Sequence, residues 1–226
     1  MRAVADMPRP LDGIRVFELS VAIAGTTVCR YMANFGAEVI KVEALDPPDV
    51  SRTHTARWLT QDAHGRQVWR DSGPHVSDFM AGQLSLGLDL KTAEGKEVAR
   101  RLLGLCDVVV TNYTVAAVRT LGLDYDTVRT ANPEIVYLGL SGYGAQGGPY
   151  HSFRAWGPNL AGLTGLDALT GWPDRPQARI PISYSDYSNG LHGLLAVLAA
   201  LEHRDRTGEG QAIDLSQFEA TVALLG

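Results

Sequence analysis

Ile14-Arg-Val-Phe-Glu-Leu19 opens the stretch of sequence that decides the fold. Its alternation of apolar and polar residues is typical of a β-strand, and the small-residue turn Ser20-Val-Ala-Ile-Ala-Gly25 follows it. A helical pattern over Thr26 to Asn34 then leads to Glu38-Val-Ile-Lys-Val42, which is typical of a second strand. This order predicts a βαβ unit. Such units require a parallel sheet, and ligands bind where the carboxyl ends of its strands meet the following loops.

Two features of the sequence resemble nucleotide-binding patterns without completing them. Glu43 follows the second strand, where a dinucleotide fold carries an acidic residue, but the preceding turn has only Gly25 where the fingerprint requires three glycines. The loop Ser141-Gly-Tyr-Gly-Ala-Gln-Gly-Gly-Pro149 contains four glycines, yet no Lys-Ser/Thr pair of a P-loop follows it. Neither pattern identifies a nucleotide site by itself.

Downstream, the pattern of helix and then strand repeats. A helix opens at Lys91-Thr-Ala-Glu-Gly95 and leads into Asp107-Val-Val-Val-Thr111, whose apolar run favours a strand buried on both faces. We expect the buried face of that helix to comprise Val98, Leu102 and Leu103. Short helices near residues 115–121 and 125–129 precede a strand at Glu134-Ile-Val-Tyr-Leu-Gly-Leu140. The sequence therefore predicts an α/β fold with an open, mostly parallel sheet of at least four strands and flanking helices.

Residues 44–83 are the least regular part of the single predicted domain, 1–226. We expect a long irregular excursion there, with one helical turn near residues 55–60, before regular structure resumes at Leu84-Ser-Leu-Gly-Leu-Asp-Leu90. The segment holds three of the six histidines, and their spacing is not that of a metal site: His54, His64 and His75. We expect no bound metal and solvated loop histidines.

Asp186 precedes a long apolar helix. It lies in Pro181-Ile-Ser-Tyr-Ser-Asp186-Tyr-Ser-Asn-Gly190, after which helical spacing predicts a buried stripe of Leu191, Leu194, Leu195, Leu198 and Leu201. Free backbone N–H groups and the helix dipole favour an ionised carboxylate there, and Ser188 and Asn189 are close enough to donate hydrogen bonds. Asp186 is thus either a simple N-cap or an oriented nucleophile.

Composition excludes several classes of protein. A net charge of -5 argues against a nucleic-acid partner or an anionic membrane surface, and no apolar run reaches membrane-spanning length. The two cysteines, Cys29 and Cys106, provide neither a disulfide framework nor a metal cluster, and the first eight residues lack the apolar region of a signal peptide. We therefore expect a cytoplasmic protein.

A series of short motifs runs in order along the chain: Pro10-Leu-Asp-Gly-Ile-Arg-Val16, Ala24-Gly25, Gly36-Ala-Glu-Val-Ile-Lys-Val-Glu43, Leu88-Asp-Leu-Lys91, Glu94-Gly95, Asn112-Tyr113, Leu121-Gly-Leu123, Asn132-Pro133, Ser141-Gly-Tyr-Gly144, Asp186, Leu198-Ala-Ala-Leu201 and Arg206-Thr-Gly-Glu-Gly-Gln211. Together these motifs resemble the class III (CaiB/BaiF-type) CoA-transferases, which include formyl-CoA and carnitine CoA-transferases and a racemase branch. The resemblance covers nearly the whole chain at compatible spacing.

The resemblance implies a Rossmann-like large domain that binds coenzyme A, with acyl-CoA and a carboxylic acid acceptor as substrates. Asp186 matches the catalytic aspartate. The stretches that contact CoA in the family fall here on Ile23, Ala24, Leu88, Asp89, Leu90, Lys91, Asn112, Tyr113, Thr114, Ser141, Gly142, Tyr143 and Gly144. Family subunits form interlocked dimers and are nearly twice as long as this chain. A homodimer or a complementary C-terminal half is therefore the expected partner, and a shortened chain, a split subunit and a degenerate gene product are alternatives.

The implied chemistry is covalent catalysis. Asp186 attacks a donor thioester, the released thiolate returns to form an aspartyl-CoA thioester, and the acceptor carboxylate repeats these steps in reverse. Backbone N–H groups at a helix start or in a glycine loop stabilise each oxyanion, by about 3 kcal/mol per donor. Water must be excluded, because it hydrolyses the anhydride.

Departures from the family pattern affect mainly basic and polar positions: Ile23 for a glutamine, Thr26 for a proline, Ala44 for an arginine, Ala81-Gly-Gln-Leu84 for a basic run and Thr120 for an arginine. The remaining basic candidates for the CoA phosphates are Lys41, Arg52, Lys91 and Arg119.

Two alternatives to a transferase stay open. The racemase branch pairs its aspartate with a histidine, whose position here holds Trp156, while His151 and His192 lie nearby in the sequence. A non-catalytic CoA-binding half is the other alternative. We rank transferase above racemase.

Overall fold

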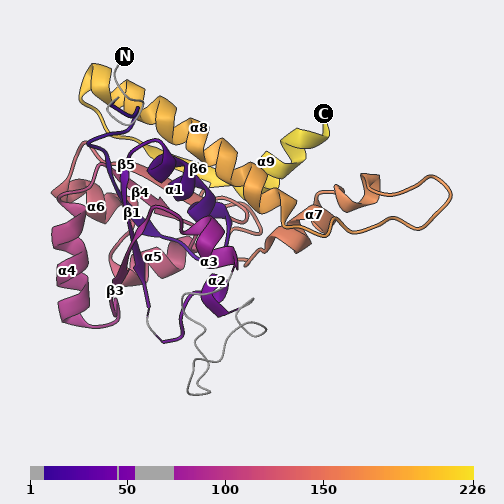
Figure 1. The fold of residues 1–226 in the computed structure, drawn as a ribbon, viewed down its shortest axis with the longest axis horizontal. Helices are drawn as coiled ribbons and strands as arrows, with labels where there is room; N and C mark the ends of the chain where they lie inside the picture. The colour runs from indigo at the N-terminus through magenta and orange to yellow at the C-terminus, as the bar shows by residue number, and fades with distance from the viewer. Residues whose placement is uncertain (1–7, 45, 54–73) are drawn as a thin grey trace, which may run out of the picture.

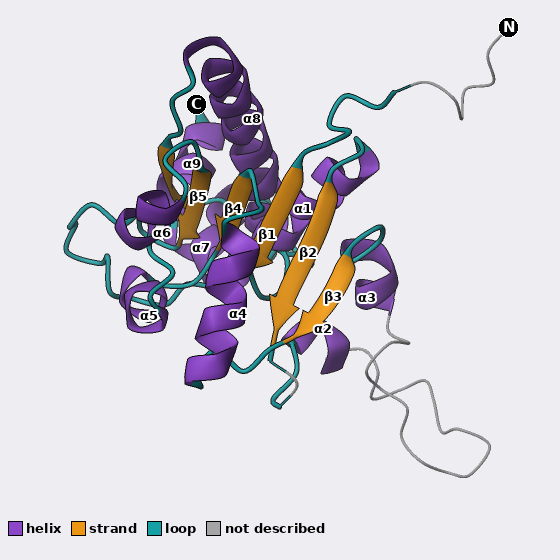
Figure 2. Cartoon of the chain, turned by 90° about the vertical axis from the view of Figure 1, so that its left-hand side faces the viewer, coloured by secondary structure: helices purple, strands orange, loops and turns teal. Residues whose placement is uncertain are grey.

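The computed structural model describes residues 8–44, 46–53 and 74–226. Within these residues, six parallel strands form one sheet in the order β3-β2-β1-β4-β5-β6 (Figures 1 and 2). The strands are β1 Arg15–Leu19, β2 Glu38–Glu43, β3 Leu84–Gly87, β4 Val108–Thr111, β5 Val136–Ser141 and β6 Ala212–Ser216. The predicted open parallel α/β sheet is confirmed, and its six strands satisfy the prediction of at least four.

Helices pack on both faces of the sheet: α1 Ala24–Asn34, α2 Val50–Thr53, α3 Pro74–Phe79, α4 Ala93–Leu103, α5 Val115–Leu121, α6 Tyr125–Ala131, α7 Gly157–Leu163, α8 Tyr184–Thr207 and α9 Gln217–Val222, with 3-10 turns at Asp167–Leu169 and Ala223–Leu225. Successive strand residues point to opposite faces, so Val16 packs in the core under α1 and α8, whereas Phe17 packs in the core under α4, α5 and α6. Burial on both faces explains the continuous apolar runs in these strands.

The order of the strands fixes where a ligand crevice lies. From β1 the chain moves outward through β2 and β3, then returns to β4 on the other side of β1. In open α/β sheets this reversal leaves a crevice beyond the carboxyl ends of the two central strands, because the following loops diverge there. The loops after β1 and β4 therefore position the site.

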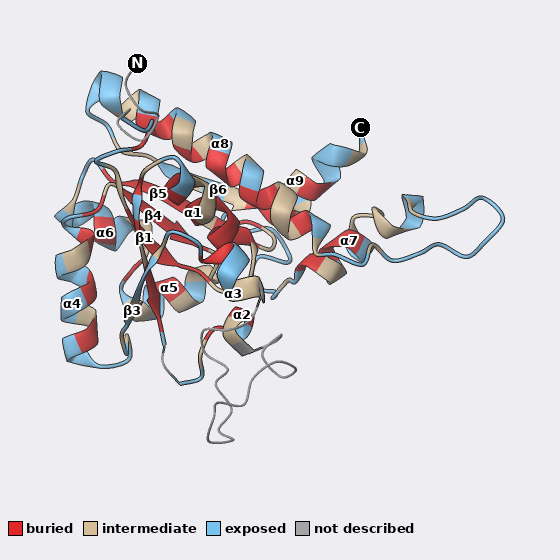
Figure 3. Cartoon of the chain, in the orientation of Figure 1, coloured by how far each residue is buried: buried red, intermediate tan, exposed pale blue. Residues whose placement is uncertain are grey.

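The buried face of α8 differs from the predicted one. Leu194 and Leu201 are buried, but Leu191 is 47% exposed and Leu195 is 68% exposed. Figure 3 shows buried and exposed positions alternating along α8. The reason is the close approach of α8 to α1, which selects small residues for the contact. A Cβ on Gly190 would lie only 2.7 Å from the Cβ of Thr27, so the glycine face turns inward and these two leucines face outward.

Other expectations need smaller corrections. Residues 44–83 include the short helices α2 and α3, while the turn expected at residues 55–60 lies outside the described residues, as do His54 and His64. Val98, which we expected to be buried, is 42% exposed, and the neighbouring Ala99 is buried instead. Strand β6 was not predicted.

Even α8, with 24 residues, lacks the uninterrupted apolar length that a bilayer crossing requires, and the same holds for the other described helices.

Candidate functional site

A cavity of about 380 Å³ lies at the carboxyl ends of β1, β4, β5 and β6. It brings together eight of the predicted site residues: Ile23, Ala24, Asn112, Tyr113, Thr114, Ser141, Gly142 and Asp186. We call it the Asp186 cavity. Its other lining residues were not predicted to bind: Val21, Ala22, Ala117, Phe153, Arg154, Ala155, Trp156 and Gln217. Most of its walls are small or apolar.

Asp186 lies in the first turn of α8, where the sequence predicted it, and its carboxylate faces a second helix start. Ser183, not Asp186, is the N-cap residue, so the simple N-cap alternative is wrong. A Cβ on Gly157, the first residue of α7, would lie 2.8 Å from Cγ of Asp186 and closer still to Oδ2. The glycine is therefore required for the carboxylate to contact the backbone of α7.

Burial controls the protonation of this carboxylate. It raises the pKa of Asp186 from 3.8 to about 6, against hydrogen bonds from the Ser183 side chain and the Gly157 backbone that lower it. Thus Asp186 is mainly ionised at pH 7 but much more basic than a surface aspartate, which enhances its reactivity as a nucleophile or a base. The expected support from its neighbours is wrong, because Ser188 donates to the Ser185 carbonyl and Asn189 donates to Gln217 and Thr221.

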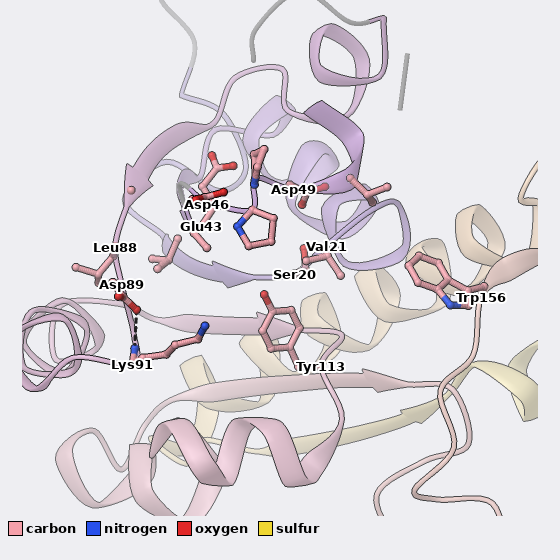
Figure 4. A pocket seen from close by; sticks show the side chains of 16 residues that line it. Ser20, Val21, Glu43, Asp46, Asp49, Leu88, Asp89, Lys91, Tyr113 and Trp156 are labelled. Carbon is pink, nitrogen blue, oxygen red and sulfur yellow. Dashed lines mark hydrogen bonds between the residues drawn. The ribbon is translucent and has the colours of Figure 1, made fainter. Parts of the chain in front are cut away.

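A second cavity of about 560 Å³ lies beside the first, at the ends of β2 and β3. Leu88, Asp89 and Lys91 line it, as the sequence predicted, and we call it the Lys91 cavity (Figure 4). Figure 4 shows the Tyr113 side chain with its hydroxyl directed into this cavity. Tyr113 and Trp156 line both cavities. The Asp186 cavity and the Lys91 cavity therefore form one continuous crevice along the carboxyl edge of the sheet.

The loop between β1 and α1 is held by side chains from three other segments. Asn112 accepts a hydrogen bond of 2.9 Å from the Val21 amide and donates one of 2.7 Å to the Val21 carbonyl. Asp49 accepts from the amide of Ala22, whose φ of 59° is a left-handed conformation that a non-glycine residue rarely adopts. Lys41 donates to the Ser20 carbonyl. The Asn112 amide is therefore used to clamp this loop, at the wall of the Asp186 cavity.

Lys41 and Arg52, two predicted candidates for CoA phosphates, are already paired. Lys41 Nζ lies 2.9 Å from Glu18 and 3.4 Å from Asp49, and all three side chains are almost fully buried. Burial alone lowers the pKa of Lys41, but these carboxylates outweigh it and raise the pKa above its usual value. Arg52 holds Glu43 through two hydrogen bonds of 2.6 and 2.7 Å, so Glu43 is occupied as well. The expectation that this lysine and arginine are available to phosphates is wrong.

Three predicted residues line neither cavity. Leu90 packs against the core below α4 and α5, the ring of Tyr143 packs at a tilt against the rings of Tyr150 and Phe218, and Gly144 forms a turn with a φ of 77°. Of the remaining basic candidates, Lys91 lines its own cavity, and Arg119 lines a third one of about 380 Å³ that shares Tyr113 and Ser141 with the Asp186 cavity.

Gln217 is a site residue that the sequence did not reveal. It directly follows β6, and the alternation in Ala212-Ile-Asp-Leu-Ser216 was the pattern that could have located it. Its side-chain nitrogen donates to the Leu140 carbonyl, whereas its oxygen Oε1 is buried without a partner, as is Oγ of Ser141. Because buried polar atoms are normally hydrogen-bonded, these two atoms suggest that the cavity receives a polar ligand. Among the described residues, no cluster of His, Cys, Asp and Glu could hold a metal ion.

Comparisons with known proteins agree with this architecture. The chain is 35% identical to a succinate–glutarate CoA-transferase of Agrobacterium fabrum, over 98% of this chain and 55% of that protein. It is also 35% identical to a succinyl-CoA–D-citramalate CoA-transferase of Chloroflexus aurantiacus, over 96% of this chain and 52% of that protein. The crystal structure of a CaiB/BaiF family protein from Brucella suis superposes with a TM-score of 0.88 at 33% identity, covering 97% of this chain and 56% of that one.

The chain therefore spans about half the length of the curated relatives it matches. The sequence profile of CoA-transferase family III nevertheless matches residues 11–226, which includes every strand of the sheet and both sides of the crevice. Hence the chain belongs to CoA-transferase family III.

Proposed function

We propose that this protein transfers coenzyme A from an acyl-CoA to a carboxylic acid through an aspartyl-CoA thioester on Asp186. The observation that carries the proposal is the position of the Asp186 carboxylate: it lines a mostly apolar cavity, and its pKa is raised to about 6. Membership of the family and the names of the two transferase relatives support the reaction class.

The crevice fits a long substrate such as acyl-CoA. The thioester end belongs in the Asp186 cavity, where the orphaned Oε1 of Gln217 and Oγ of Ser141 offer hydrogen bonds to polar groups near the sulfur. The remainder of the molecule then extends along the sheet edge past Tyr113 into the Lys91 cavity. Of the basic candidates that the sequence suggested for the phosphates, Lys91 in the Lys91 cavity and Arg119 in the third cavity remain, because Lys41 and Arg52 pair with carboxylates.

Each step exchanges one bond for another. A carboxylate oxygen of Asp186 bonds to the thioester carbon, and the carbon–sulfur bond breaks to give an anhydride and a CoA thiolate. The thiolate then attacks the aspartyl carbonyl, which forms the aspartyl-CoA thioester and releases the donor acid. An acceptor carboxylate then attacks the aspartyl-CoA thioester, which forms a second anhydride and releases the CoA thiolate. The thiolate attacks the acyl carbonyl of this anhydride and yields the new acyl-CoA and free Asp186.

The start of α1 provides backbone donors for the oxyanions of these steps. Ile23 and Ala24 line the Asp186 cavity at this helix start, and no side chain caps the first amides of the 11-residue helix. Unpaired N–H groups of this kind stabilise a developing negative charge, at about 3 kcal/mol for each donor. These backbone N–H groups can stabilise the oxyanion even though Ile23 has no polar side chain and stands in place of a glutamine.

The pH dependence of the reaction follows from the raised pKa of Asp186. Only the ionised form attacks, so kcat/KM is expected to rise about tenfold per pH unit up to about pH 6 and to level off above it. An aspartate with the ordinary pKa of 3.8 would instead give a flat profile down to about pH 4. Steady-state transfer rates between about pH 4.5 and pH 8 distinguish the two profiles.

Gly157→Ala is expected to lower kcat by about 100-fold, because the new Cβ displaces the carboxylate of Asp186. The matched control is Gly162→Ala in the same helix, where the nearest atom to a new Cβ lies 3.7 Å away. That variant should retain transfer within about twofold. Equal rates for the two variants would show that contact with Gly157 does not position Asp186.

The transferase and the racemase differ in the catalytic groups that each reaction requires. A racemase requires two bases, and no histidine of the described chain lines the Asp186 cavity; His192 bonds to the Ser188 carbonyl of its own helix and His151 to the Gly148 carbonyl. Incubation with an acyl-CoA and a labelled carboxylic acid should therefore label the CoA thioester. Deuterium exchange at the α carbon without an acceptor acid would instead support the racemase, and CoA binding without either reaction would support the non-catalytic half.

A second polypeptide, either another copy or a complementary C-terminal half, is the partner we infer. The chain between α7 and α8 projects from the body as an arm (Figure 1), and Leu169 and Trp172 on it are each 72% exposed. Exposed apolar residues of this size favour burial against a partner. We also infer a cytoplasmic location, which the buried free thiols of Cys29 and Cys106 support.

A further inference from the structure

The charges of the Asp186 cavity are unusually simple. Among the described residues that line it, Asp186 is the single acid and Arg154 the single base. Six of the thirteen arginines in the described residues pair with carboxylates, as Arg15 does with Glu38 and Arg204 with Asp107. Arg154, by contrast, has no hydrogen bond or ion pair within the described chain. A free guanidinium on the wall of a ligand cavity is available to an anionic group of the ligand.

The position of Arg154 favours the acyl end of the substrate over the phosphates of CoA. Gly157 is three positions after Arg154 in the chain, so the two Cα atoms lie at most about 11 Å apart, and Gly157 contacts the Asp186 carboxylate. The reacting carbon must meet Asp186, whereas the phosphates lie beyond the whole pantetheine arm. The walls of the same cavity include Ile23, Ala155 and Trp156, which suit methylene groups.

We propose that Arg154 binds the distal carboxylate of a short dicarboxylic acyl group and so selects dicarboxylyl-CoA substrates. This inference rests on the proposed function, since it assumes that the thioester carbon reaches Asp186. The planar guanidinium presents two parallel N–H donors to a carboxylate, a geometry that a terminal methyl group cannot use. The subsite therefore distinguishes succinyl-CoA from butyryl-CoA, which share CoA and chain length.

The test measures the rate at which an adduct forms on Asp186 from succinyl-CoA and from butyryl-CoA, with no acceptor acid present. Arg154→Gln is expected to lower the rate with succinyl-CoA by roughly 10- to 100-fold and to change the rate with butyryl-CoA by less than about twofold. Arg154→Lys should recover part of the loss. Arg206→Gln, which changes an exposed arginine in the last turn of α8 outside both cavities, is the matched control and should change neither rate.

An equal loss with both donors would overturn the proposal, because it would place Arg154 on the shared CoA portion. An unchanged rate with succinyl-CoA would overturn it as well. Absence of an adduct from either donor in the unmodified protein would contradict the proposed function itself. Calorimetric measurement of acyl-CoA binding to Asp186→Asn, which cannot form the adduct, separates the role of Arg154 from the proposed function. In that variant, Arg154→Gln should weaken the binding of succinyl-CoA roughly tenfold and leave the binding of butyryl-CoA unchanged.

Discussion

Replacing Asp186 with asparagine is expected to lower the rate of CoA transfer by at least about 1,000-fold and, at the same time, to stabilise the fold. The first effect follows because an amide is not a nucleophile and no other acid of the described chain lines the cavity. The second follows because an ionised carboxylate is held where burial raises its pKa to about 6. A shift of this size from 3.8 corresponds to roughly 3 kcal/mol above pH 6.

The sign of the stability effect provides an internal control. The folded protein binds the Asp186 proton more tightly than the unfolded chain, so the destabilisation is complete above pH 6 and disappears as the pH falls towards about 4. Urea unfolding of Asp186→Asn should therefore show a gain of about 2–3 kcal/mol at pH 7 and almost none at pH 4. A loss of stability at pH 7 would show that the carboxylate is a structural cap rather than a reactive group.

Lys41→Met is expected to reduce the free energy of unfolding by about 3–5 kcal/mol, the largest stability effect of any single site considered. Lys41 is 1% exposed and neutralises Glu18, which is fully buried, and Asp49. Without the ammonium group, two carboxylates remain close together inside the protein. The Ser20 carbonyl also loses a donor, so the loop that lines the cavity loosens.

Urea unfolding at pH 7 measures this loss. Arg9→Met is the control, because Arg9 and Asp12 form an exposed pair 3.0 Å apart, and removing a solvent-screened pair of this kind should leave the stability nearly unchanged. The double variant Glu18→Gln, Lys41→Met should recover part of the loss, since it removes one of the unpaired charges. Similar values for Lys41→Met and Arg9→Met would contradict the importance of the buried cluster.

Much of the fold could be predicted because its strands are buried on both faces. The apolar run in Asp107-Val-Val-Val-Thr111 predicted β4. The short helices predicted at residues 115–121 and 125–129 correspond closely to α5 and α6. Strand β6 was missed because it lies at the sheet edge, where half-exposed residues such as Ile213 give a weaker pattern. On α8, the contact with α1 through Gly190 decided the buried face, and apolar spacing alone does not contain that information.

The site was predicted in its location but not in its interactions. The spacing of motifs placed Asp186 and the loop residues at the sheet edge, and most of them share one cavity. Pairing depends on segments far apart in sequence, however, so nothing near Lys41 in the sequence revealed Glu18 and Asp49 as its partners. The same is true of Asn112, whose amide binds the Val21 backbone 91 residues away. Burial of the Asp186 carboxylate arises likewise from α7, which only the tertiary structure brings into contact.

Peptide mapping by mass spectrometry after incubation with an acyl-CoA tests the central claim most directly. If Asp186 is the nucleophile, the peptide that contains residue 186 should gain the mass of CoA less one water, and hydroxylamine should release the CoA and leave a hydroxamate on Asp186. Asp186→Asn should gain none. An adduct on any other residue, or transfer between acids without an adduct at Asp186, would contradict the mechanism.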